Sequence, residues 1–204
     1  MAPFLDTVKS FADVPITDAG VDTAAFLDAS TGVLGLFDIL GSTAFAPVTS
    51  DIKGNISKVR ARYEATPAQS ATLEELVKNE QGEKKRTATE GLMWLLRGLA
   101  FTCAALLTAQ ADNKVELSTA FTRGYEQTLK KFHGILVKGI FTVAMKACPY
   151  RKDFYAKLAA DPTGGPPAPE SKVSEELDKW LAALDLIVKR MEAFYEKNGY
   201  NKGF

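Results

Sequence analysis

The sequence predicts an all-α protein, and two observations carry that prediction. Prolines are absent from Ala68 through Ala147, and apolar residues recur at steps of three or four along most of the chain. The alternation of apolar and polar residues that marks a half-buried strand does not persist over six or more residues. The 204 residues suffice for a substantial core, so we expect residues 1–204 to form one domain.

Four helices are expected in the first part of the chain. The first covers residues 22–40, with an aspartate suited to the N-cap at its start and Gly41 directly after its end. The second covers residues 47–63 and begins with proline, which is tolerated in a first turn. A short helix is expected over residues 73–79, and a buried, strongly apolar helix over residues 87–109.

The longest helix is expected over residues 117–147, where Pro149 follows its end. Its apolar stripe keeps steps of three or four: Leu117, Phe121, Tyr125, Leu129, Phe132, Leu136, Ile140 and Ala144. A short helix follows over residues 153–159, then a proline- and glycine-rich loop over 161–169. A last helix covers residues 173–197 before an irregular tail.

Composition excludes several classes of protein. Lys plus Arg and Asp plus Glu both total 25, so no net positive field attracts nucleic acid or anionic membranes. Two cysteines, Cys103 and Cys148, predict a reducing compartment and no disulfide framework. The apolar run 92–109 is interrupted by Arg97 and looks too short to cross a bilayer. Without the marks of a signal peptide at residues 1–6, a cytoplasmic protein is expected.

A polar stripe marks the second helix. Asp51, Asn55 and Lys58 stand at i, i+4 and i+7 and therefore share a narrow helical face. A carboxylate, an amide and an ammonium together suit the hydroxyls and amide of a glycolipid head, which indicates binding more than catalysis. The alternative is a solvated face with one weak Asp51–Asn55 contact worth roughly a few tenths of a kcal/mol.

Three other residues can contribute to such a site. Trp94 can stack on a sugar ring or simply pack in the core, and Arg97 in the same apolar helix needs a carboxylate or carbonyl partner. His133, the single histidine, is either a satisfied core residue or an N–H donor to a buried ligand carbonyl. No second histidine or cysteine cluster accompanies it, so no metal site is predicted.

Catalytic motifs are missing from the sequence. It has no G-x-S-x-G, no phosphate-binding loop and no H-E-x-x-H. Only His133 could serve a Ser-His-Asp site, and no serine lies near it in the sequence. We therefore predict no catalytic residue, no cofactor and no enzymatic activity.

Four motifs together resemble the glycolipid transfer protein family. They are D-x3-N-x2-K at 51–58, W-L-L-R-G-L at 94–99, L-K-K-F-H-G at 129–134 and C-P-Y-R-K-D-F at 148–154. The resemblance extends from about Thr23 to the C-terminal tail. It implies an all-α domain of two helical layers with the lipid between them. It also implies a non-enzymatic carrier that moves a glucosylceramide-like glycosphingolipid between membranes.

The resemblance also assigns ligand-binding residues by position: Asp51, Asn55, Lys58, Trp94, His133 and Tyr200. Asp51 and Asn55 would hydrogen-bond the first sugar, and Asp51 would also accept the ceramide amide N–H. Lys58 would reach sugar hydroxyls, and Trp94 would stack beneath the ring. His133 would bond the ceramide carbonyl.

Other features concern specificity and the hydrocarbon chains. Phosphosphingolipid carriers have a lysine where this chain has Asn55 and an arginine where it has Phe101, so a neutral sugar is favoured. Six residues could line an apolar pocket, although they would equally serve any helical core: Leu92, Phe101, Leu129, Leu136, Ile140 and Phe141. Some family members carry a membrane-contacting tryptophan two residues after the histidine, where this chain has Ile135.

The predicted partners are a glycosphingolipid and, transiently, the surface of a membrane. Aromatic and cationic residues that suit peripheral docking, or an ordinary surface helix, are Tyr150, Arg151, Lys152, Phe154 and Tyr155. No nucleic acid is expected. Two alternatives stay open: a glycolipid sensor that acts through an unknown protein partner, and an enzyme that acts on sphingolipids.

Overall fold

The computed structural model describes residues 3–41 and 43–204, and these residues are mostly helical. The α-helices are α1 Pro3–Thr7, α2 Thr23–Leu40, α3 Ala46–Ala65, α4 Leu73–Glu80, α5 Thr87–Ala111, α6 Leu117–Gln127, α7 Ile135–Lys146, α8 Arg151–Ala159 and α9 Glu170–Asn198. The 3₁₀ turns are η1 Phe11–Asp13, η2 Thr43–Phe45, η3 Pro67–Gln69 and η4 Lys130–Phe132. In the described part of the chain only two isolated β-bridges occur, and no strand.

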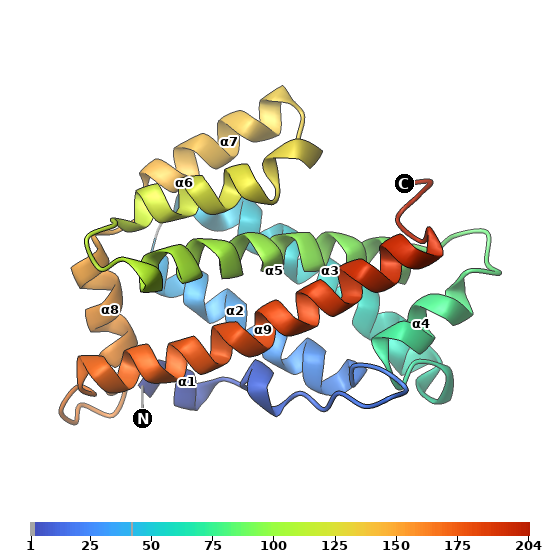
Figure 1. Ribbon diagram of the computed structural model, residues 1–204, viewed down its shortest axis with the longest axis horizontal. Helices are drawn as coiled ribbons and strands as arrows, with labels where there is room; N and C mark the ends of the chain where they lie inside the picture. The colour runs from blue at the N-terminus through green and yellow to red at the C-terminus, as the bar shows by residue number, and fades with distance from the viewer. Residues whose placement is uncertain (1–2, 42) are drawn as a thin grey trace.

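Helix α5 is the centre of the fold. It packs against α3, α6 and α9, and Figure 1 shows α6 and α7 on one side of it and α9 on the other. One continuous apolar core joins these helices. Both cysteines have free thiols, and Cys103 is buried in that core.

Local signals place several helix ends where the sequence predicts them. The Asp22 carboxylate accepts a 2.8 Å hydrogen bond from the backbone N–H of Ala25, which caps the start of α2. Gly41 ends the same helix with a positive φ of 70°, a conformation that costs glycine little. The remaining predicted helices α3, α4, α5, α8 and α9 differ from the observed bounds by at most three residues.

The prediction of one long helix over residues 117–147 is wrong. The chain leaves the helix after Gln127, forms η4, and is extended at His133 (ψ 137°) and Gly134 (ψ 174°) before α7 begins. Apolar residues recur at steps of three or four within α6 and again within α7. Because the two series happen to stay in phase, the spacing gives no sign of the break between the two helices. Glycine at 134 disfavours a continuous helix, and α9 with 29 residues is the longest element described.

Two helices, α2 and α5, are long and apolar enough by composition to cross a membrane. The expectation that Arg97 leaves the α5 run too short was therefore wrong. Within the fold, however, 67% of the apolar window of α5 is buried. Burial of this kind is what a core helix of a globular protein requires, so the apolar character of α5 is explained by its central position.

An N-terminal segment that the sequence analysis did not assign completes the core. Phe11 in η1 packs edge-on against Trp180 of α9, with ring centroids 4.9 Å apart, and tilts against Phe26 of α2. Trp180 is among the largest fully buried side chains, whereas Trp94 is only half-buried. The two tryptophans therefore differ in role, and Trp94 is the one accessible to a ligand.

Candidate ligand-binding site

The polar stripe on α3 is a connected chain of side chains. The Asn55 Nδ2 donates to Asp51 Oδ2 at 3.2 Å, and the Lys58 ammonium donates to Asn55 Oδ1 at 3.1 Å. Asn55 is 3% exposed, while Asp51 and Lys58 reach solvent. The amide thus joins the carboxylate to the ammonium two turns away, and it retains one N–H and one lone pair for another partner.

The Asp51 carboxyl is partly desolvated. Burial raises its pKa above the ordinary value of 3.8, against the opposing effects of the Lys58 charge and the hydrogen bond from Asn55. A carboxylate forms charge-assisted hydrogen bonds to donors that reach it. Asp51 is therefore the strongest acceptor on the stripe for a hydroxyl or an amide N–H.

Two glycines on α5 let this helix pack closely against α3. A Cβ added at Gly91 would lie 3.0 Å from the Lys58 Cβ, and one at Gly98 would lie 3.4 Å from Ile52 Cγ1. Helices α3 and α5 are thus antiparallel and closely packed at these points, because glycine leaves room for the facing helix. Trp94 lies between Gly91 and Gly98 on α5, so along the helix axes it stands between the levels of Lys58 and Ile52.

Aromatic residues from the segment after α6 cover Trp94. The ring centroid of His133 lies 6.4 Å from that of Trp94 with planes only 17° apart, and the Phe132 ring stands edge-on at the same distance. The Arg97 guanidinium lies 4.5 Å from the Trp94 centroid and 3.7 Å from that of Phe132. Its close contacts are therefore π faces, and the carboxylate of Glu192 acts on it through charge, in keeping with the expected carboxylate partner.

His133 lies in the turn before α7, and its predicted place on a helical face was wrong. Its Nδ1 is 3.1 Å from the Tyr125 hydroxyl oxygen, and its ring centroid is 4.7 Å from that of Phe141. Burial, together with the charges of Lys138 and Arg97, lowers its pKa below the ordinary 6.5. The ring is therefore neutral at physiological pH, with one donor and one acceptor nitrogen.

Four of the six expected pocket residues are buried: Leu92, Phe101, Leu129 and Phe141. The Phe101 ring contacts those of Phe141 at 5.7 Å and Tyr125 at 6.1 Å between centroids. The other two, Leu136 and Ile140, are 80% and 39% exposed on α7, so their place in a pocket stays a prediction. The break before α7 turns these residues outward, whereas a continuous helix would have kept them on the stripe.

Tyr200 lies against α9. Its ring centroid is 5.6 Å from that of Phe194, and its backbone N–H donates to the Tyr195 carbonyl at 3.0 Å. The nearby tail is held by Arg86, which donates to the Lys202 carbonyl at 2.8 Å. These contacts do not bring Tyr200 to the α3 stripe.

The docking patch expected around α8 is mostly structural. Phe154 is fully buried, the Tyr155 hydroxyl donates to Gln110, and Arg151 donates to the Ala109 carbonyl. These contacts attach α8 to the end of α5, and Tyr150 is the one large aromatic of the patch that is strongly exposed. Exposed apolar side chains gather on α7 instead: Ile135, Leu136, Val137, Ile140 and Val143.

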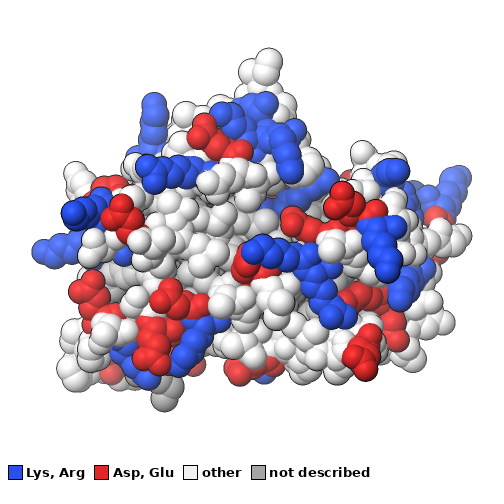
Figure 2. Space-filling model, viewed as in Figure 1, with Lys and Arg blue, Asp and Glu red and all other residues white. Residues whose placement is uncertain are grey.

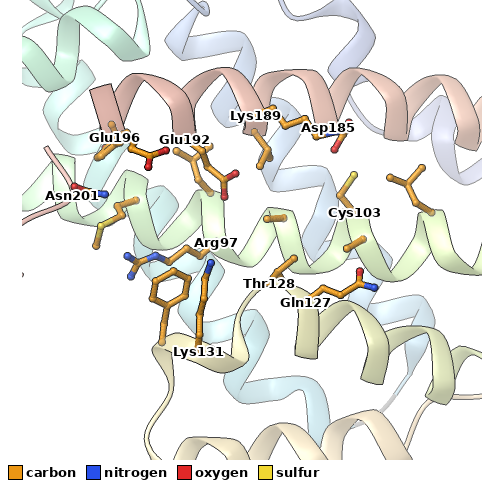
Figure 3. A pocket seen from close by; sticks show the side chains of 18 of the residues that line it. Arg97, Cys103, Gln127, Thr128, Lys131, Asp185, Lys189, Glu192, Glu196 and Asn201 are labelled. Atoms are coloured by element: carbon orange, nitrogen blue, oxygen red, sulfur yellow. Dashed lines mark hydrogen bonds and ion pairs between the residues drawn. The ribbon is translucent and has the colours of Figure 1, made fainter. Parts of the chain in front are cut away.

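A groove of about 740 Å³ lies between α5, η4 and α9, and sequence reasoning missed it. Figure 3 shows Arg97 and Lys131 reaching into this space, into which Glu192 of α9 also points. Burial raises the Glu192 pKa, while Lys131 and Arg97 oppose the effect. The lining residues come from α5, the end of α6, η4, α9 and the tail, so no local pattern could indicate the groove.

The charged side chains of the described residues indicate neither a nucleic-acid surface nor a metal site. Figure 2 shows both signs of charge interspersed over one face, in keeping with the zero net charge. Across residues 3–41 and 43–204, no group of three or more His, Cys, Asp or Glu side chains could hold a metal ion. The hydrogen-bonded stripe of α3 and the aromatic side chains around Trp94 are therefore the strongest candidate site.

Comparison with known proteins identifies the family. A model of the glycolipid transfer protein family matches residues 21–160. The chain is 48% identical over 192 residues to the glycolipid transfer protein of Aureobasidium melanogenum, covering 94% of this chain and 92% of that protein. It is 34% identical to the canine pleckstrin homology domain-containing family A member 8, with 96% of this chain covering 39% of that longer protein.

Solved structures share the fold. HET-C2, a fungal glycolipid transfer protein, is 48% identical and superposes with a TM-score of 0.87 over 95% of this chain and 96% of that one. FAPP2, whose structure describes selection of simple glycosphingolipids, is 32% identical with a TM-score of 0.85, covering 98% and 97% of the two chains. The predicted all-α, two-layer fold is confirmed, and this chain belongs to the glycolipid transfer protein family.

Proposed function

We propose that this protein is a non-enzymatic carrier that binds a glycosphingolipid and moves it between membranes. The observation that supports the proposal most is the Asp51–Asn55–Lys58 chain at the level of Trp94. It combines a partly desolvated carboxylate, an amide with one N–H and one lone pair still free to bond, and an ammonium, and the flat ring of Trp94 belongs to the helix packed against it. The relatives named above bind or transfer glycolipids, in keeping with this assignment.

A neutral sugar suits the proposed headgroup site, formed by Asp51, Asn55, Lys58 and Trp94, better than a phosphate does. Asp51 and Asn55 accept hydrogen bonds from hydroxyls, Lys58 donates to them, and the Trp94 ring stacks on the apolar face of a hexose. Lys58 is the one cation of the stripe and already donates to Asn55, and the guanidinium of Arg97 contacts the rings of Trp94 and Phe132. Glucosylceramide is therefore the proposed ligand, with Asp51 also accepting the ceramide amide N–H.

The hydrocarbon chains would enter between α6 and α7. Each methylene removed from water contributes about 0.8 kcal/mol, so a carrier needs an apolar interior that substitutes for the bilayer. Helix α7 buries only Phe141, Ala144 and Met145, and it lies at the edge of the fold (Figure 1). An outward displacement of α7 would separate Phe141 from Phe101 and open that interior at the cost of few contacts.

Membrane contact would be peripheral and would use α7. Ile135 is 92% exposed and Leu136 is 80% exposed, and Lys138 and Lys146 lie on the same short helix. Apolar side chains flanked by lysines suit the headgroup region of a bilayer. Docking there would bring the proposed entrance for the chains to the membrane. We place the carrier in the cytoplasm, in transient contact with membranes.

Transfer of labelled glucosylceramide between vesicles tests the proposal. We expect Asp51→Val to abolish transfer while its helical circular dichroism stays native, because the ligand amide would lose its acceptor. The matched control is Glu64→Val, which removes an exposed carboxylate from the far end of the same helix. Unaltered transfer by Asp51→Val would refute the assignment.

The same assay separates the alternatives. A carrier moves many lipids per protein and leaves them chemically unchanged. Stoichiometric capture without transfer would indicate a sensor, and covalent change in the recovered lipid would indicate an enzyme. Preference for ceramide 1-phosphate over glucosylceramide would overturn the assignment of a neutral sugar.

A further inference from the structure

We infer that Tyr125 is a positioning residue that holds the neutral His133 ring in the tautomer with its proton on Nε2. The Tyr125 hydroxyl oxygen lies 3.1 Å from His133 Nδ1, within hydrogen-bonding distance. The other ring nitrogen, Nε2, then carries the N–H that a ligand carbonyl can accept. The role of that N–H in binding rests on the proposed function, whereas the tautomer itself does not.

The hydroxyl must be the donor in this pair. A phenol has one hydrogen to donate, and a neutral imidazole has one donor and one acceptor nitrogen. In the described part of the chain, His133 Nδ1 is the hydrogen-bond partner found for the Tyr125 hydroxyl. If Nδ1 donated instead, the phenolic hydrogen of a 2% exposed side chain would have no acceptor, and an unmade buried hydrogen bond costs free energy.

Aromatic packing holds the hydroxyl in place. The Tyr125 ring is stacked on Phe141, with centroids 4.8 Å apart and planes 12° apart, and it stands edge-on to Phe101. Gly124 lets α6 approach α5 closely, since a Cβ there would lie 2.7 Å from the Ala105 backbone nitrogen. Burial also raises the pKa of Tyr125, so the phenol keeps its hydrogen.

The geometry of the imidazole ring links the hydrogen bond at Nδ1 to the protonation of Nε2, the nitrogen that would face a ligand. Nδ1 and Nε2 lie on opposite sides of the ring axis, so a ring whose Nδ1 faces Tyr125 directs Nε2 away from it. The pKa of His133 is lowered by burial, Lys138 and Arg97, so the ring is neutral and its tautomer matters. Loss of the Tyr125 hydroxyl would let the proton move to Nδ1 and leave Nε2 as an acceptor facing a carbonyl.

Nitrogen-15 NMR of the ligand-free protein tests the inference directly. His133 is the only histidine, so its two ring nitrogens can be assigned without ambiguity. We expect the Nε2–H form in the unmodified protein and a mixture of tautomers in Tyr125→Phe. The control is Tyr195→Phe, which removes a buried hydroxyl that donates to the Thr89 carbonyl at 2.8 Å, and it should leave His133 unchanged.

Two results would overturn the inference. The first is an Nδ1–H tautomer in the unmodified protein, which needs no substitution and so remains decisive if Tyr125→Phe folds poorly. The second is a folded Tyr125→Phe protein whose His133 is still entirely in the Nε2–H form. Native circular dichroism of each variant establishes that the comparison is between folded proteins.

Binding of glucosylceramide then tests the functional consequence. We expect Tyr125→Phe to weaken binding about fivefold, the size of one modest hydrogen bond. In a His133→Gln protein the glutamine amide can donate to the ligand carbonyl whether or not Tyr125 is present, because an amide has no tautomers to select. Adding Tyr125→Phe to that protein should therefore change binding little. Equal losses in both backgrounds would mean that Tyr125 acts only by packing. If the unmodified protein bound no glycosphingolipid, the proposed function would fail while the NMR result would still decide the tautomer.

Discussion

Replacement of Asn55 by leucine should separate ligand binding from stability. Leucine branches at Cγ as asparagine does, and Asn55 is 3% exposed beside Ile52 and Ile56 on α3. The change removes the hydrogen bonds to Asp51 and from Lys58, each worth about 0.5–1.5 kcal/mol net. Both partners reach solvent and can bond to water instead, and the buried leucine gains apolar contacts. We therefore expect the free energy of unfolding to change by no more than about 1 kcal/mol.

The effect on binding should be much larger. In the proposed complex Asn55 and Asp51 bind sugar hydroxyls, and leucine would leave one or two of these groups unpaired in a desolvated site. Each unpaired group costs about 1–3 kcal/mol, and a loss of about 2.8 kcal/mol corresponds to a hundredfold increase in Kd. The variant should thus bind glucosylceramide about a hundredfold more weakly.

Two measurements on one preparation separate the effect of Asn55→Leu on stability from its effect on binding. Urea unfolding gives the stability, and quenching of Trp94 fluorescence by the lipid gives the Kd, with Trp180 as a buried constant background. Glu64→Leu is the matched control, since it exchanges an exposed polar residue of α3 for leucine. The reasoning is refuted if Asn55→Leu loses several kcal/mol of stability yet binds the lipid normally, because Asn55 would then serve the core alone.

Two more predictions concern pH and membrane contact. The lowered pKa of His133 means that the unfolded chain binds a proton more readily, so its contribution to stability is complete above pH 6.5 and is lost as pH falls below that value. Urea unfolding at pH 7.5 and 5 should show this loss, reduced in His133→Gln; an equal loss in both would contradict it. Ile135→Glu should slow transfer between vesicles without changing stability or binding of a short-chain glycolipid, and normal transfer rates would exclude α7 as the docking surface.

Several features of this protein follow from local sequence. The carboxylate of Asp22 and the conformational freedom of Gly41 determine the ends of α2 without reference to the rest of the chain. The spacing of Asp51, Asn55 and Lys58 places them on one helical face in any fold that keeps α3. These predictions succeeded because hydrogen-bond caps and helical periodicity act over a few residues.

Other features depend on contacts between distant segments. The path from α6 to α7 leaves the helix at Thr128, and η4 and His133 then pack on Trp94 and Tyr125; apolar spacing alone could not distinguish this from one long helix. The same break exposes Leu136 on α7. Arg97 contacts aromatic rings from two elements.

The sequence by itself thus determined the helical class, most helix ends and the polar stripe of α3, because each arises from interactions within a few turns. The tertiary structure alone decided which residues meet that stripe, which apolar side chains stay outside, and which hydroxyl faces His133. Those outcomes depend on how helices pack, and packing is set by steric fit and burial across the whole chain.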